Sequence, residues 1–294
     1  MEIVCHIGAS NADGDRVLPT LLQNAEPLRK AGVLVPGQGR YRKILRNAIS
    51  EVADAADGAA VASAVRDEFL LQILDGQDVR RLVMSSSTLL AMPAWVFVNG
   101  VFYSGAGQRI AALTRLFPDD EVEVFLALSN PATFIPAVWR MSGLGWDAFL
   151  RGVDPLSVRW SELITRIRKA SPRARLRVWC TEDTPFVWGT LLRRLAGVGS
   201  DMAMTGEYDL LGDLITPVGK ERFLSYIRTC PGQTDLQMRQ VIGAFLERYA
   251  TPEASIEEVE APGWDARLVD AMTQAYDEDA ARIAQIPGVE FLAP

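Results

Sequence analysis

Residues 3–15 read Ile-Val-Cys-His-Ile-Gly-Ala-Ser-Asn-Ala-Asp-Gly-Asp, and the leucines that follow at positions 18, 21, 22 and 28 recur at helical spacing. The first five of these residues are mostly apolar and have the length of a buried β-strand. A glycine-containing loop then leads into an amphipathic helix predicted over 17–30, which ends at Gly32. A strand, a loop and a helix in this order form the first unit of a parallel α/β sheet.

The rest of the chain continues this alternation of strands and helices. Further strands are predicted at 81–85, 121–128 and 175–180, with a possible edge strand at 289–292. Asn99-Gly100 indicates a short hairpin within 96–103. Helices are predicted at 41–53, 60–74, 108–116, 133–141, 157–170 and 184–196, and the last third, about 216–286, is predicted to be wholly helical. We therefore expect one α/β domain over residues 1–294, with a mostly parallel central sheet and a helical C-terminal third.

Composition narrows the classes of partner. The chain has 294 residues, 49% of them hydrophobic, and a formal net charge of −7, so it can form a large core and lacks the positive charge typical of nucleic-acid or anionic-membrane binding. Basic residues gather only at 40–46 and 166–177, where they alternate with apolar residues as on solvated helix faces. No apolar run approaches the roughly 20 residues that span a bilayer. The N-terminus lacks the regions of a signal peptide, and we expect a cytoplasmic protein.

The three cysteines, Cys5, Cys180 and Cys230, are odd in number and none pairs at Cys-x-x-Cys spacing. Two of them lie in predicted strands. We expect reduced, unbridged thiols and no cysteine metal site.

In a parallel sheet, ligands bind where strands end and loops begin. The loops to consider are 8–15, 85–88, 129–131 and 181–184, each after a predicted strand. His6 is the only histidine and is interpreted either as a ligand-contacting base or as a buried strand-end residue. A Ser-His-Asp triad would need His6, but no serine lies in a Gly-x-Ser-x-Gly turn.

Acidic residues and one aromatic-basic pair complete the candidates. Asp13 and Asp15 suit either a hard cation or the start of the first helix, and capping is the preferred interpretation. Glu182 and Asp183 before Thr184-Pro185 are likewise interpreted as a helix cap, with a catalytic acid as the alternative. Trp139 and Arg140 are predicted to face the ligand end of the sheet.

Several of these segments, in order, resemble the P-loop sulfotransferases of bacteria. The resemblance covers nearly the whole chain and is strongest in its opening, where His6-Ile7-Gly8 is followed by a loop, a helix and Gly32-Val33-Leu34-Val35-Pro36. It continues in the strand ends Ser85-Ser86 and Asn130-Pro131. It also includes the acidic loop at 181–183, a helix containing Tyr276-x-x-Asp279, and the ending Gly288-Val289-x-Phe291-Leu292.

The resemblance implies a three-layer P-loop domain and, if the family activity is retained, 3′-phosphoadenosine 5′-phosphosulfate as the sulfuryl donor. The acceptor would be a hydroxyl of a small molecule or carbohydrate. His6 and Ser87 would then occupy catalytic positions. The donor-binding positions implied by the resemblance are Gly8, Ser10, Asn11, Gly14, Asp15 and Ser129.

This chain departs from the family at the positions that would hold the donor. The family's loop lysine is replaced by Asn11, and Asp13 and Asp15 add two carboxylates. Ser87 stands at a position that is often glutamate. Ser129 replaces an arginine for the 3′-phosphate, and Ala137 replaces a serine with the same role. These losses favour a non-catalytic or altered relative that no longer binds the donor in the family's manner; an active sulfotransferase and a transferase using another donor remain as alternatives.

Overall fold

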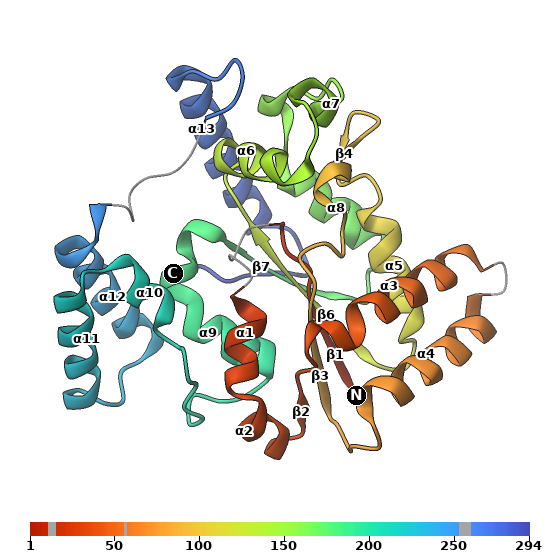
Figure 1. The fold of residues 1–294 in the computed structure, drawn as a ribbon, viewed down its shortest axis with the longest axis horizontal. Helices are drawn as coiled ribbons and strands as arrows, with labels where there is room; N and C mark the ends of the chain where they lie inside the picture. The colour runs from red at the N-terminus through yellow and green to blue at the C-terminus, as the bar shows by residue number, and fades with distance from the viewer. Residues whose placement is uncertain (11–15, 56–57, 253–259) are drawn as a thin grey trace.

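The computed structural model describes residues 1–10, 16–55, 58–252 and 260–294 and shows an α/β fold around one parallel sheet (Figure 1). Its six strands lie in the order β2-β3-β1-β6-β7-β8, and every neighbouring pair is parallel. The strands are β1 Glu2–His6, β2 Val33–Leu34, β3 Arg81–Ser85, β6 Glu121–Leu128, β7 Arg175–Cys180 and β8 Val289–Phe291. The four main strands expected from the sequence are thus consecutive neighbours, and the expected edge strand is β8.

Helices cover both faces of the sheet and make it the middle of three layers. On one side, α3 (Gln38–Asp54), α4 (Gly58–Leu74), α5 (Ala106–Leu116) and α8 (Trp160–Ala170) pack against one another. On the other side, α1 (Val17–Gln23) and α9 (Thr184–Ala196) contact each other and β3. Helices on both faces are what strands alternating with helices produce in a parallel sheet.

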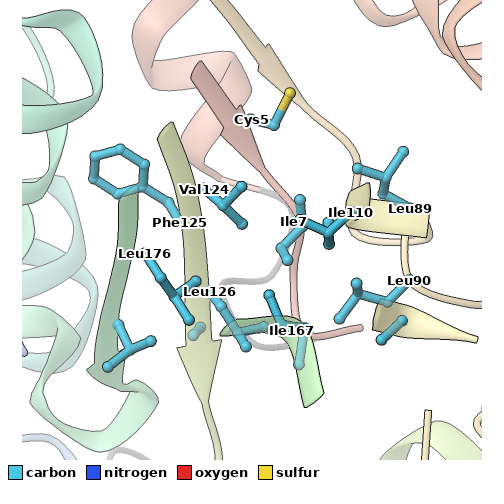
Figure 2. Packing of buried hydrophobic residues seen from close by; sticks show 14 of the residues in the cluster. Cys5, Ile7, Leu89, Leu90, Ile110, Val124, Phe125, Leu126, Ile167 and Leu176 are labelled. Carbon is cyan, nitrogen blue, oxygen red and sulfur yellow. The ribbon is translucent and has the colours of Figure 1, made fainter. Parts of the chain in front are cut away.

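The core covers both faces of the sheet: on one face it lies between the strands and α5 and α8, and on the other it includes buried leucines of α1 and α9. Figure 2 shows Ile7 and Leu126 from the strand region facing Ile110 of α5 and Ile167 of α8. All four side chains are at most 1% exposed. Fully burying an aliphatic side chain of this size is worth about 1.5–3 kcal/mol, so this contact is a main source of stability.

The helix predicted over 17–30 is divided, and the prediction of one continuous helix is wrong. α1 ends at Gln23 and α2 runs over Ala25–Lys30, with Asn24 between them. The Asn24 side chain donates to the carbonyl oxygens of Thr20 and Thr205 and accepts from the backbone N–H of Thr205. Pro27 has no N–H, so it cannot extend the hydrogen-bond ladder of α1.

The Asn99-Gly100 turn forms as expected. β4 (Phe97–Val98) pairs antiparallel with β5 (Val101–Phe102). Asn99 has φ of 52° and Gly100 has φ of 74°, the pair of positive values that a tight hairpin turn requires. The hairpin places Phe102 against Trp160 of α8 with ring centroids 4.9 Å apart.

The C-terminal third is mostly helical, as predicted, but it begins earlier and is interrupted. α10 (Asp209–Leu214), α11 (Pro217–Thr229) and α12 (Asp235–Tyr249) lie together at one side of the molecule (Figure 1). They enclose a small second core of Leu211, Ile215, Phe223 and Ile242. α13 (Ala266–Ile283) instead packs on α6 (Pro131–Ser142) and α8. The short helix α7 (Trp146–Leu150) was not predicted. Among the described residues, no helix is long and apolar enough to cross a membrane.

A buried ionic cluster joins three strands at their amino ends. Arg81 of β3 is 3% exposed, and its guanidinium donates to Glu2 of β1 at 2.6 Å and to Glu123 of β6 at 3.0 Å. It also donates to the carbonyl oxygens of Arg194 and Leu195, near the end of α9. Partial burial would raise the pKa of Glu2, but the hydrogen bond and charge of Arg81 outweigh it and leave that pKa lowered.

All three cysteines are free thiols, as expected, and their environments differ. Burial raises the pKa of Cys5 and of Cys180 to about 12, whereas Cys230 is exposed. Because the thiolate is the nucleophile, we predict that iodoacetamide at neutral pH labels Cys230 rapidly and the other two only after unfolding. Mass spectrometry of the native and denatured protein checks this result. Equal labelling of all three cysteines in the native protein would contradict the burial of β1 and β7.

Candidate functional site at the carboxyl edge of the sheet

The loop after β1 is held between the ends of β3 and β6. The backbone N–H of Ile7 donates to the Phe125 carbonyl at 2.9 Å, and Ala127 donates to the Gly8 carbonyl at 2.7 Å. On the other side, Ser86 donates to the His6 carbonyl at 2.8 Å. Three strand ends therefore converge where a parallel sheet binds its ligands.

Three of the predicted site residues meet where this loop contacts the loop after β3. Gly8 has φ of +107°, and a Cβ on it would lie 3.0 Å from the Ser87 carbonyl oxygen and 3.1 Å from the Ser10 nitrogen. Only glycine fits this conformation and this close approach. The Ser10 hydroxyl, 1% exposed, donates to the Ser87 carbonyl at 3.2 Å. The Ser10 hydroxyl is thus used inside the protein, whereas Asn11, Gly14 and Asp15 lie outside the described residues.

His6 is enclosed at the end of β1. Its ring is 1% exposed, and Nδ1 lies 2.9 Å from the Ser85 hydroxyl. The ring centroid is 5.8 Å from that of Trp179 on β7. This environment fits the buried strand-end interpretation of His6. Ser87, in contrast, is half-buried in the loop after β3.

The start of α6 binds an internal carboxylate. Asn130 caps this helix, since its side-chain oxygen accepts from Ala132 at 3.0 Å. The backbone N–H of Asn130 donates to Glu182 Oε1 at 2.8 Å, and Tyr276 donates its hydroxyl to Glu182 Oε2 at 2.9 Å. Ser129 is 8% exposed, and its carbonyl accepts from the indole N–H of Trp160 at 2.8 Å.

The prediction that Glu182 caps the following helix is therefore wrong. α9 has Asp183 at its N-cap, and that side chain makes no capping hydrogen bond. Residues Thr181–Asp183 form a short 3-10 turn instead, which directs Glu182 back toward the adjacent strand end. Burial, with the charge of Glu182, raises the pKa of Asp183. At the first helix, the N-cap is Arg16, without a side-chain cap bond, and the predicted caps Asp13 and Asp15 lie outside the described residues.

Helix α13 closes this end of the sheet through three successive turns. Thr273 accepts a hydrogen bond from the Asn130 side chain at 2.8 Å, and Tyr276 donates to Glu182. Asp279, 2% exposed, accepts from the backbone N–H of Ser161 at the start of α8 at 3.0 Å. Burial and the charge of Glu182 raise the pKa of Tyr276, so its phenol stays protonated as a donor. The Tyr276-x-x-Asp279 pattern thus has a structural role in this chain.

A basic cavity of about 380 Å³ lies beside the same edge, between α3, α5 and the loop after β3. α3 is tied to the strand end because the Tyr41 hydroxyl accepts from the Ser85 N–H at 2.7 Å and donates to the Ser85 carbonyl. The cavity is lined by Arg42, Lys43, Arg46, Ile49, Ser86, Thr88, Leu89, Met92 and Arg109.

The sequence prediction of a solvated helix face at 40–46 missed this cavity. Arg42, Arg46 and Ile49 follow at intervals of four and three residues, so they share one face of α3, beside its buried stripe. That spacing indicates a shared basic face on α3. Arg109, however, comes from α5, and no local sequence pattern links it to α3.

Other features of the molecule are less suited to a ligand. Cavities of about 210, 460 and 360 Å³ involve residues 170–175, which precede or begin β7 at the amino-end edge of the sheet. Trp139 is half-buried against Trp146 at 5.1 Å between ring centroids, and exposed Arg140 donates to the Glu260 carbonyl. These two residues pack with α7 and the 260 region. Within the described parts of the chain, no three His, Cys, Asp or Glu side chains converge as a metal site.

Comparisons of this chain with models of protein families, with curated proteins and with solved structures gave no match. The fold and the site define its class as a three-layer α/β protein with its candidate ligand site at the carboxyl edge of a parallel sheet.

Proposed function

We propose that this chain is a cytoplasmic, P-loop sulfotransferase-like protein that has lost the family's usual binding of 3′-phosphoadenosine 5′-phosphosulfate. It would act as a non-catalytic or altered relative with a small-molecule or carbohydrate ligand. The observation that carries the proposal is the Glu182 carboxylate, which accepts the backbone N–H of Asn130 at 2.8 Å. In the resemblance, this strand end is where the donor's 3′-phosphate would bind.

Electrostatics explains why the carboxylate opposes such a ligand. Two like charges about 4 Å apart repel by about 4 kcal/mol at an effective dielectric near 20. An arginine at position 129 and a serine at position 137 would offset this repulsion, but the chain has Ser129 and Ala137 there. A phosphate would also have to displace Glu182 from the hydrogen bond donated by Tyr276.

The loop after β1 supports the same conclusion from its chemistry. A phosphate-binding loop gathers backbone N–H groups and a lysine around the anion. Here Asn11 replaces the lysine, and Asp13 and Asp15 add negative charge. The described part of the loop uses the Ser10 hydroxyl to bind the Ser87 carbonyl.

Restoring the missing groups tests the proposal. We expect the combined variant Asn11→Lys, Ser129→Arg, Glu182→Gln to gain calorimetric binding of adenosine 3′,5′-bisphosphate over the unmodified chain. Each restored charged hydrogen bond is worth about 1.5–3 kcal/mol, so the gain should be at least tenfold in affinity.

The matched control is Asp183→Asn in place of Glu182→Gln, because it removes the same charge one residue away without a bond to Asn130. It should gain less than the Glu182 variant. If both combinations bind equally, or neither differs from the unmodified chain, Glu182 is not what excludes the phosphate. Release of adenosine 3′,5′-bisphosphate from the donor by the unmodified chain would show an active sulfotransferase instead.

A further inference from the structure

The basic cavity between α3 and α5 concentrates positive charge in an acidic protein. Arg42, Lys43 and Arg46 approach it from α3, and Arg109 approaches it from α5. The formal net charge of the chain is −7, so this cluster has the opposite sign to the molecule as a whole. Arg42 and Arg46 are also four residues apart on one helix, and two like charges at this spacing destabilise the helix.

In the part of the chain that the structure describes, these cations differ from the neighbouring Arg40 in having no carboxylate partner. Within the described residues, none of the four has an Asp or Glu oxygen within the 4.0 Å of an ion pair. Arg40, on the same helix but outside the cavity, does pair with Asp75 at 3.4 Å. Clustered positive charges without a protein counterion are compensated when an anion binds among them.

Two of the guanidinium groups are positioned by the protein backbone. Arg42 Nε donates to the Ser85 carbonyl at 3.4 Å, and Arg109 Nη1 donates to the Leu89 carbonyl at 3.3 Å. A guanidinium has five N–H donors, so each of these bonds leaves donors to face a ligand. The forked arrangement of these donors matches the oxygens of a phosphate or sulfate group.

The rest of the lining indicates more than an inorganic ion. Ile49 and Leu89 contribute apolar side chains that are 5% and 7% exposed, and Met92 is 53% exposed at the cavity. Ser86 and Thr88 add hydroxyl groups from the loop after β3. At about 380 Å³, the cavity is in the range of small-molecule sites, which combine apolar walls with a few placed polar groups.

We propose that this cavity binds a small organic ester of phosphate or sulfate, with the oxyanion held by Arg42, Arg46 and Arg109 and the organic group against Ile49, Leu89 and Met92. The inference goes beyond the loss of donor binding and does not depend on it, because none of these residues belongs to the loop after β1 or to the Glu182 cluster.

Calorimetric titration with phenyl phosphate and phenyl sulfate tests this proposal, with phenol and inorganic phosphate as partial probes. We expect at least one of the two esters to bind more tightly than either partial probe, with an affinity that falls as salt rises. The stronger of the two esters identifies which oxyanion the cavity prefers.

Arg46→Gln and Arg109→Gln are expected to weaken that binding at least about tenfold each, because each removes a charged donor. Arg40→Gln is the matched control: it lies on the same helix, loses the same charge and should change affinity less than about twofold. Circular dichroism confirms that these exposed variants fold. Glu182→Gln should leave the binding of the ester unchanged, which separates this result from the test of the donor site.

Failure of the unmodified chain to bind either ester at millimolar concentration would overturn the proposal. Binding that is equal in the Arg46→Gln, Arg109→Gln and Arg40→Gln variants would also overturn it, since the ester would then bind elsewhere.

Discussion

Replacing Arg81 with methionine is expected to lower the free energy of unfolding by about 3–5 kcal/mol, because it removes one member of a buried ionic cluster. Methionine fills much of the same volume but cannot replace the guanidinium bonds to Glu2 and Glu123. Glu123 is itself 2% exposed and would lose one of its two close charged partners in the interior, keeping only Arg177 of the two. The carbonyl groups of Arg194 and Leu195 would also lose their donor. Chemical denaturation measures the change.

Arg175→Met provides the matched control. Arg175 begins β7 as Arg81 begins β3, and it pairs with Glu121 at 3.0 Å and, more distantly, with Glu123 at 3.6 Å, but its side chain is 57% exposed. Exposed ion pairs contribute about 0–1 kcal/mol, so this variant should be nearly as stable as the original protein. A loss below about 1 kcal/mol for Arg81→Met would contradict the buried cluster.

Trp160→Ala is expected to cost about 3–5 kcal/mol of unfolding free energy, as large-to-small changes of buried aromatic residues do. The indole is 1% exposed and packs on Phe102 and Phe134 at ring-centroid distances of 4.9 and 5.3 Å. Its N–H donates to the Ser129 carbonyl, so it also fixes the end of β6 where the site begins. Thermal and urea unfolding should both report the loss.

Trp95→Ala is the control for this change. Trp95 is 57% exposed, and the Arg151 guanidinium lies over its ring, 4.6 Å from the centroid. An exposed cation–π contact contributes about 0.5–1 kcal/mol. Comparable losses for the two tryptophan variants would show that Trp160 is not the aromatic centre between the β4–β5 hairpin, α6 and α8.

The sheet could be predicted from the sequence because its signals are local. Apolar runs such as 121–128 mark a strand that is buried on both faces. The Asn99-Gly100 pair predicts its hairpin because both residues accept a positive φ. The division of the first helix at Asn24 depends instead on Thr205, which is far away in sequence, so helical periodicity alone could not reveal it.

The site could be predicted only in part. The sequence placed Gly8, Ser10 and Ser87 at strand ends, and the structure brings these three together. It gave no sign that Glu182 turns back to Asn130, since this contact joins the ends of two neighbouring strands.

The basic cavity was missed for the same physical reason. From the sequence, Arg42 and Arg46 are predicted to lie on a solvated helix face. Only the structure brings Arg109 of α5 to the same cavity. The parts of the site that lie at strand ends could therefore be predicted. The parts formed by side chains distant in sequence could not, because no local spacing indicates that they meet.

We propose that the Glu182 carboxylate and the missing cations prevent this chain from holding the sulfuryl donor. Titration of adenosine 3′,5′-bisphosphate into the unmodified protein, followed by calorimetry, tests this claim most directly. We predict no saturable micromolar binding that depends on the loop after β1, because the Asn130 amide already binds Glu182 and that loop lacks its lysine. Micromolar binding that is lost in an Asn11→Ala or Gly14→Ala variant, but retained in Arg46→Gln, would contradict it.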